Sequence, residues 1–136
     1  MPILLDRRSK IFLGSRDTMD RSTLIFPTDD GTPNPNIVQG WCRIEDNGTY
    51  TDIAETNIIT RYFELVMFTR WDRTVSQHPI LLTRVELVGE PYADLQTFQN
   101  PDGRWRVTNR SNPLGQERRR YLQFTLQRAS YPITNI

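Results

Sequence analysis

Residues 60–71 read TRYFELVMFTRW, and this stretch decides the fold class. Aromatic and β-branched side chains are frequent in it, which is typical of a β-strand. Alternation gives the strand two apolar faces, with Phe63, Leu65 and Met67 on one and Tyr62, Val66 and Phe68 on the other. A strand that is apolar on both faces is usually central in its sheet, or another element covers its second face. We therefore expect a β-sheet domain built around this segment.

Three more strands are predicted towards the C-terminus, in residues 80–88, 104–108 and 119–128. Apolar side chains occupy alternate positions in them: Leu81, Val85 and Leu87 in the first, Trp105 and Val107 in the second, and Leu122, Phe124 and Leu126 in the third. This alternation buries one face of each strand and exposes the other, as in antiparallel sheets. The C-terminal half therefore predicts four strands in all.

The N-terminal half combines weaker strand signals with strong turn signals. Residues 37–45 predict a strand, and Asn47-Gly48 directly after it is the dipeptide most typical of a tight hairpin turn. Residues 27–36, PTDDGTPNPN, contain three prolines and a glycine, which indicates an exposed loop. Shorter elements are expected at residues 10–13 and 23–26 (strands) and at residues 51–57 (a helix).

Together these elements predict an all-β domain, mainly antiparallel, that forms a small β-barrel or sandwich with long loops and extended termini. The chain has 136 residues, which is the size of one domain. We expect an N-terminal arm and loop (residues 1–36), a β core (residues 37–128) and an extended C-terminal tail (residues 129–136).

Basic residues are unusual in kind: sixteen are arginine and one, Lys10, is lysine, against sixteen carboxylates. Arginine holds carboxylates with two parallel hydrogen bonds and is enriched at protein interfaces, where lysine is depleted. The net charge of +1 argues against a dedicated nucleic-acid binder, which usually carries a strongly basic surface. The composition therefore indicates contacts with neighbouring subunits, although codon usage in a GC-rich genome would also favour arginine.

Residues with catalytic or metal-binding potential are isolated in the sequence. His78 is the single histidine, Asp29-Asp30 lies in the proline-rich loop, and Cys42 is the single cysteine, which excludes an intrachain disulfide. We expect a loop histidine, a solvated turn and a buried, inert thiol, and hence no enzyme, cofactor or metal site. No apolar run approaches the roughly 18 residues of a membrane helix, and the first residues do not resemble a secretory signal. The expectation is therefore a protein made in a reducing cytoplasm.

Arginine clusters and apolar termini are the candidate interface residues. The arginines are Arg7, Arg8, Arg104, Arg106, Arg118, Arg119 and Arg120, and the C-terminal residues are Tyr131, Ile133 and Ile136. Those from 104 to 120 flank two neighbouring strands, so we expect them to meet at one edge of the sheet, as an ion-pair seam between subunits or a surface that faces phosphates. They could equally be solvated strand ends that prevent edge pairing. An extended tail suits strand addition to a neighbour, and a frayed terminus is the alternative.

The order of several segments resembles that of a known family. The segments are residues 40–45 (GWCRIE), 61–65 (RYFEL), 70–73 (RWDR), 84–90 (RVELVGE) and 119–124 (RRYLQF). This pattern, which covers residues 38–128, is similar to the head-closure (stopper, or head–tail adaptor) proteins of tailed bacteriophages. The chain departs from the family in the long segment before Trp41 and in extra length at residues 94–109.

The resemblance implies a small β-barrel or sandwich that assembles into a homo-oligomeric ring of twelve or six copies. Such a ring lies in the virion neck between the portal or its adaptor and the tail, helps to retain the DNA, and is assembled in the host cytoplasm. It implies a channel-facing loop at residues 45–57, with Asp46, Asn47, Tyr50 and Asp52, or at the proline-rich residues 27–36, and non-specific DNA contact in the channel. No membrane partner is implied.

Two other classes of function remain open from the sequence. Another phage structural component, such as a baseplate, tail or capsid-cement protein, would share the interface properties but lack the channel. A small β-barrel nucleic-acid binder or an enzyme is the remaining class, and the former would show affinity for oligonucleotides that falls steeply with salt.

Overall fold

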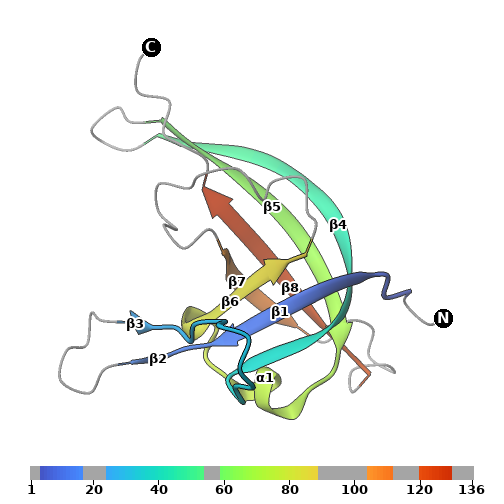
Figure 1. Ribbon diagram of the computed structural model, residues 1–136. Helices are drawn as coiled ribbons and strands as arrows, with labels where there is room; N and C mark the ends of the chain where they lie inside the picture. Colours follow the sequence, from blue (N-terminus) through green and yellow to red (C-terminus); the bar gives the residue numbers. More distant parts are fainter. Residues whose placement is uncertain (1–3, 17–23, 54–58, 89–103, 112–119, 130–136) are drawn as a thin grey trace.

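Six antiparallel strands close into a β-barrel in the computed structural model, which describes residues 4–16, 24–53, 59–88, 104–111 and 120–129 (Figure 1). Around the barrel the strands are β1 (Arg7–Leu13), β4 (Ile37–Ile53), β5 (Ile59–Arg70), β8 (Tyr121–Ala129), β7 (Trp105–Ser111) and β6 (Thr83–Leu87). Pairing of β1 with β6 closes the ring of strands. The all-β, antiparallel prediction is therefore confirmed, and the barrel is the form that the domain takes.

Smaller elements lie outside the barrel wall. The strands β2 (Ser15–Arg16) and β3 (Leu24–Ile25) form a separate two-stranded sheet. The helix α1 (Arg73–Gln77) and the 3-10 turn η1 (Ile80–Leu82) connect β5 to β6. Asp72 caps α1, because its carboxylate accepts a hydrogen bond of 3.0 Å from the backbone N–H of Val75.

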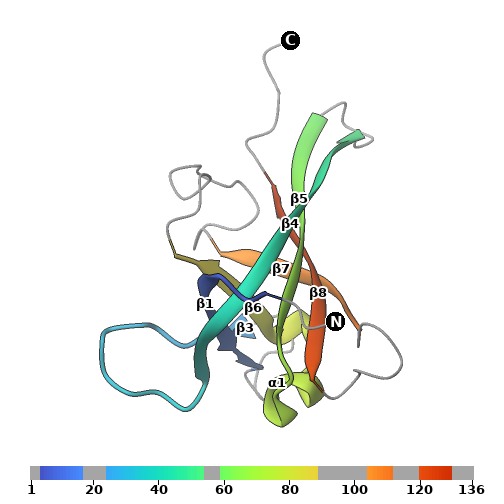
Figure 2. The same cartoon turned by 90° about the vertical axis from the view of Figure 1, so that its right-hand side faces the viewer.

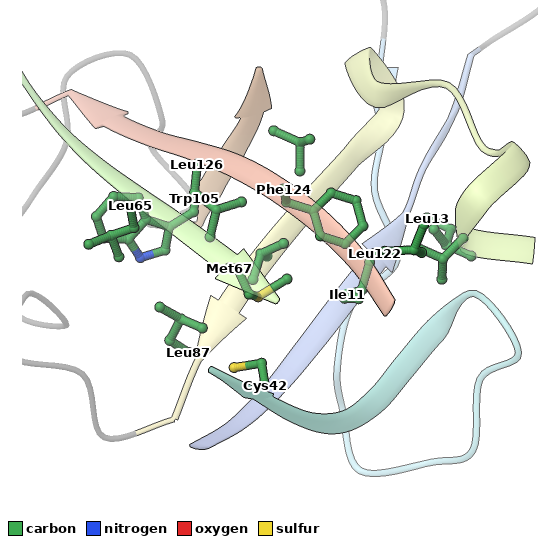
Figure 3. Packing of buried hydrophobic residues seen from close by; sticks show 13 residues of the cluster. Ile11, Leu13, Cys42, Leu65, Met67, Leu87, Trp105, Leu122, Phe124 and Leu126 are labelled. Carbon is green, nitrogen blue, oxygen red and sulfur yellow. The ribbon is translucent and has the colours of Figure 1, made fainter. Parts of the chain in front are cut away.

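The barrel interior is filled by the alternate apolar residues of its strands. Figure 3 shows Leu65, Met67, Trp105, Phe124 and Leu126 pointing towards one another between the strands. Trp105, Met67, Phe124 and Leu126 are completely buried. Burial of each such side chain contributes roughly 1.5–3 kcal/mol. The predicted inner faces of β5, β7 and β8 therefore supply much of the core.

The strand predicted at residues 80–88 begins later than expected. Residues 80–82 form η1, in which the N–H of Leu82 donates to the carbonyl of Pro79 (3.0 Å). Alternation holds only from Thr83, so Val85 and Leu87 are buried while Leu81 is 48% exposed. The prediction that Leu81 belongs to the core is therefore wrong, because a 3-10 turn does not preserve the period of two.

The expected N-terminal arm (residues 1–36) also needs correction. Its residues 7–13 form β1, which pairs with β4 on one side and with β6 on the other. Ile11, Phe12 and Leu13 are all buried. The β core therefore starts at Arg7 and not at residue 37, because the barrel cannot close without this strand.

The expected hairpin turn at Asn47-Gly48 is a β-bulge in the middle of β4. Asp46 pairs with Leu65 and Thr49 with Phe63, so Asn47 and Gly48 together oppose Glu64. Gly48 has φ +89°, and its N–H donates to the Asp46 carboxylate (2.8 Å). Turn chemistry is thus present locally, but pairing with β5 resumes beyond it and β4 continues to Ile53. Residues 51–53 are therefore strand, not the start of a helix, and residues 54–57 lie outside the described part.

Candidate functional site

Arginine side chains of the barrel stack on aromatic rings of the same chain. The guanidinium carbon lies 5.5 Å from the ring centre for Arg8 over Trp41, 4.5 Å for Arg84 over Phe26, 3.7 Å for Arg104 over Phe12 and 4.8 Å for Arg128 over Trp105. A planar, weakly hydrated guanidinium makes such contacts better than an ammonium group. Stacking within the chain therefore explains part of the preference for arginine over lysine.

Other arginines bind backbone carbonyls and neighbouring side chains. Arg110 donates through Nη1 to the carbonyl oxygen of Val75 (2.9 Å) and to that of His78, which ties the C-terminal end of α1 to β7. Burial lowers the pKa of Arg110 from its ordinary value. Arg106 donates to the side-chain oxygen of Gln127 (3.2 Å). An exposed ion pair joins Arg43 to Glu45 (3.5 Å).

The expected arginine edge is not formed, because β7 and β8 are antiparallel. Arg106 pairs with Gln127 near the end of β8, whereas Arg120 directly precedes the start of β8. Arg104 and Arg106 therefore lie at the opposite end of this strand pair from Arg120, and a closed barrel has no open edge there. Arg118 and Arg119 lie outside the described residues.

Arg7 and Arg8 stand at the start of β1, where they pair in register with Cys42 and Trp41. Arg8 is exposed and Arg7 half-buried. The predicted tail residues Tyr131, Ile133 and Ile136 lie outside the described part of the chain. Of the predicted interface residues, Arg8 is thus placed beside an exposed tryptophan.

The predicted channel loop is instead an extension of β4 and β5, here called the β4–β5 arm (residues 45–53 and 59–64). β8 still pairs with β5 at residues 62–64, and only the outer part, residues 51–53 with 59–61, is two-stranded in the described part of the chain. Figure 2 shows β4 and β5 running past the ends of the other strands. Asp46 and Asn47 are exposed on it, and Asn47 donates to the Glu64 carboxylate (2.8 Å). Tyr50 and Asp52 belong to the same strand, in register with Tyr62 and Thr60. Between Arg43 and Arg61 the chain carries four carboxylates and neither lysine nor arginine.

An apolar groove of about 810 Å³, here called the Trp41 groove, lies near the other end of β5. Its lining includes Leu4, Val38, Trp41 and Trp71, with Arg70 and Asp72 as charged members. Trp41 is 52% exposed and Leu4 is 67% exposed. A side chain at Gly40, also in the lining, would meet no atom within 4 Å, so the groove is open there.

Sequence reasoning did not single out this groove, although one signal was present. Cys42 faces the core, so the period of two places its neighbour Trp41 on the outer face. A tryptophan on an outer face, beside Gly40, predicts an exposed apolar surface. The second tryptophan, Trp71, follows β5 and could not be placed beside Trp41 without the register of the two strands.

The residues that the sequence marked as potentially reactive, Cys42, His78 and Asp29-Asp30, are engaged in contacts within the fold. Cys42 is fully buried, and burial raises the pKa of its thiol to about 11, in keeping with the predicted inert thiol. The His78 ring nitrogen Nε2 lies 2.9 Å from the carbonyl oxygen of Gly14. The single lysine, Lys10, donates to Asp29 and thereby ties the proline-rich loop to β1. That hydrogen bond is the main cause that lowers the pKa of Asp29, and hydrogen bonds from Thr32 lower the pKa of Asp30.

Metal-ligating side chains are scattered among the described residues. Those residues contain no group of three or more histidine, cysteine, aspartate or glutamate side chains placed to hold a metal ion. In the described part of the chain, α1 and η1 are too short to span a bilayer as an apolar helix. The described surface also carries the acidic β4–β5 arm and an apolar groove with arginines beside it. In comparisons with known proteins, no family model, no curated protein and no solved structure matches this chain.

Proposed function

We propose that this protein is a structural component of a tailed-phage virion, a connector or stopper subunit that forms a ring between the portal or its adaptor and the tail. The observation that carries the proposal is the β4–β5 arm on a closed barrel. Two-stranded ribbons are at best marginally stable in water, and their open edges invite pairing. An arm of this kind is best explained by a neighbouring subunit that covers it.

The sequence pattern supports the same role. The segments that resemble head-closure proteins include the start of the groove (residues 40–45), the inner half of the arm (61–65) and the turn into α1 (70–73). Each of these segments contributes residues to the arm or to the Trp41 groove, and Cys42 and Leu65 within them belong to the core. A protein whose exposed features are an arm and a groove is suited to assembly rather than to chemistry.

The charge of the arm bears on how such a ring would retain DNA. The arm carries four carboxylates (Glu45, Asp46, Asp52 and Glu64) against one arginine, Arg61, so its net charge repels phosphate at short range. We propose that the ring retains DNA by narrowing the passage, so that DNA contacts remain weak and non-specific. Oligonucleotide affinity in the micromolar range or tighter, with a steep dependence on salt, would instead favour a nucleic-acid binder.

Mass measurement of the purified protein by light scattering, together with negative-stain imaging, tests this function. We expect closed rings of twelve or six copies at raised protein concentration. A stable monomer that binds the capsid surface would contradict the proposal, and threefold assemblies would favour a capsid-cement protein.

A further inference from the structure

We infer that the acidic β4–β5 arm of one copy docks in the Trp41 groove of the next copy, so that subunits join head to tail. The inference rests on the proposed ring and names the surfaces that build it. The occupant of the groove is therefore a second copy of this chain.

The outer part of the arm has open edges among the described residues. In the described part of the chain, β1 pairs with β4 only as far as Cys42, and β8 pairs with β5 only from Tyr62 onwards. Beyond these points three pairs, Thr51–Arg61, Asp52–Thr60 and Ile53–Ile59, have only each other. Among the described residues, no strand pairs with their outer backbone groups, and such open edges invite pairing with a neighbouring surface.

The Trp41 groove presents apolar and basic side chains that suit it to bind the arm. Trp41 and Leu4 expose large apolar surfaces, and aromatic side chains in such pockets are the usual energetic centres of protein interfaces. Arg70 lines the groove, and Arg8 stacks over Trp41. The groove thus presents an apolar floor with basic side chains at its margin.

Basic residues continue beyond the groove on the same end of the barrel. Arg73 and Arg120 are exposed, and each is adjacent in sequence to a lining residue, Asp72 or Tyr121. One exposed carboxylate, Asp6, stands beside the lining residue Leu5, so the positive charges are in excess. Asp72 is engaged by the N–H of Val75 as the cap of α1. The charge of this end is therefore complementary to the arm, which carries four carboxylates (Glu45, Asp46, Asp52 and Glu64) against one arginine, Arg61.

The tip of the arm lies too far from the Trp41 groove of the same copy to bind in it. Arg70 ends β5 at the groove and Ile59 begins it at the tip of the arm, so the two are separated by the whole strand. At about 3.3 Å per residue the separation is roughly 36 Å. Contacts between two different surfaces are heterologous, and heterologous contacts generate rings when the rotation between subunits closes.

Charge reversal on each surface separately tests the docking. The arm variant is Glu45→Lys with Asp52→Lys, and it leaves Asp46 intact because that carboxylate holds the N–H of Gly48 in the bulge. The groove variant is Arg70→Glu with Arg73→Glu, both at exposed side chains. Arg16→Glu, on exposed β2, is the matched control for the loss of a positive charge. Near-ultraviolet circular dichroism checks that each variant keeps the packed core.

Light scattering then gives a distinct result for head-to-tail docking. Each variant alone should be monomeric, whereas Arg16→Glu should assemble as the natural chain does. A mixture of the two variants should regain assembly with alternating copies, because the natural arm fits the natural groove and the reversed arm fits the reversed groove. The chain with all four substitutions should regain ring assembly.

The failures of the two proposals can be told apart. Rings formed by the natural chain and by both variants would overturn the docking and leave the ring function standing. A natural chain that stays monomeric would overturn the ring function and the docking with it.

Discussion

Replacement of Gly48 by alanine should destabilise the protein through backbone strain alone. Gly48 has φ +89° in the bulge of β4, a conformation that costs an L-residue roughly 1–2 kcal/mol. An added Cβ would meet no atom within 4 Å, so no steric clash contributes. The matched control is Gly40→Ala in the same strand, where the Cβ also meets no atom within 4 Å and φ is not positive. Loss of chain entropy in the unfolded state stabilises both variants by about 0.4–1 kcal/mol.

The difference between the two variants isolates the strain. We expect Gly48→Ala to be less stable than Gly40→Ala by about 1–2 kcal/mol in urea unfolding followed by tryptophan fluorescence. Gly48→Asn should fall between them, since asparagine tolerates positive φ better than alanine. Equal stability of Gly48→Ala and Gly40→Ala would show that residue 48 does not hold a left-handed conformation, and the bulged register of β4 would then be wrong.

Three further predictions concern the core, the thiol and the loop. Phe124→Ala, at a fully buried position, should cost roughly 3–5 kcal/mol, whereas Leu81→Ala should change the free energy of unfolding by less than about 0.5 kcal/mol; equal effects would contradict the observed inner face. Cys42, whose pKa is raised to about 11, should resist a thiol reagent at pH 8 until urea unfolds the barrel, and rapid labelling of the folded protein would refute its burial. The pKa of Asp29 is lowered in the folded state by Lys10, so its contribution is present above the unfolded pKa of about 3.9 and is lost as pH falls through the folded value. Lys10→Met should therefore flatten the pH dependence of unfolding below about pH 4, and an unchanged acid profile would contradict the ion pair.

Much of the barrel could be predicted from single strands because alternation is a local property. The buried Phe124 and Leu126 on β8, and Val85 on β6, follow from a period of two that the sequence displays directly. β1 was harder to recognise, because residues 7–10 are polar and only Ile11, Phe12 and Leu13 mark it as strand. Closure of a barrel is a non-local requirement, and no short window of sequence reveals it.

The prediction of a hairpin turn at Asn47-Gly48 was wrong for a related reason. The same dipeptide supplies a positive φ to a hairpin turn or to a bulge, and only pairing on both sides of it separates the two. The prediction that Arg104, Arg106 and Arg120 meet at one edge was wrong because β7 and β8 are antiparallel, and the direction of a strand decides which ends lie together. The Trp41 groove depends on a strand register that composition cannot supply.

Imaging of the purified natural chain tests the central claim most directly. Class averages from electron microscopy at raised protein concentration, with mass from light scattering on the same sample, give the copy number and the symmetry. The account predicts a closed ring of twelve or six copies whose subunits join head to tail. A chain that remains monomeric at every concentration, or assembles with threefold symmetry, would contradict it.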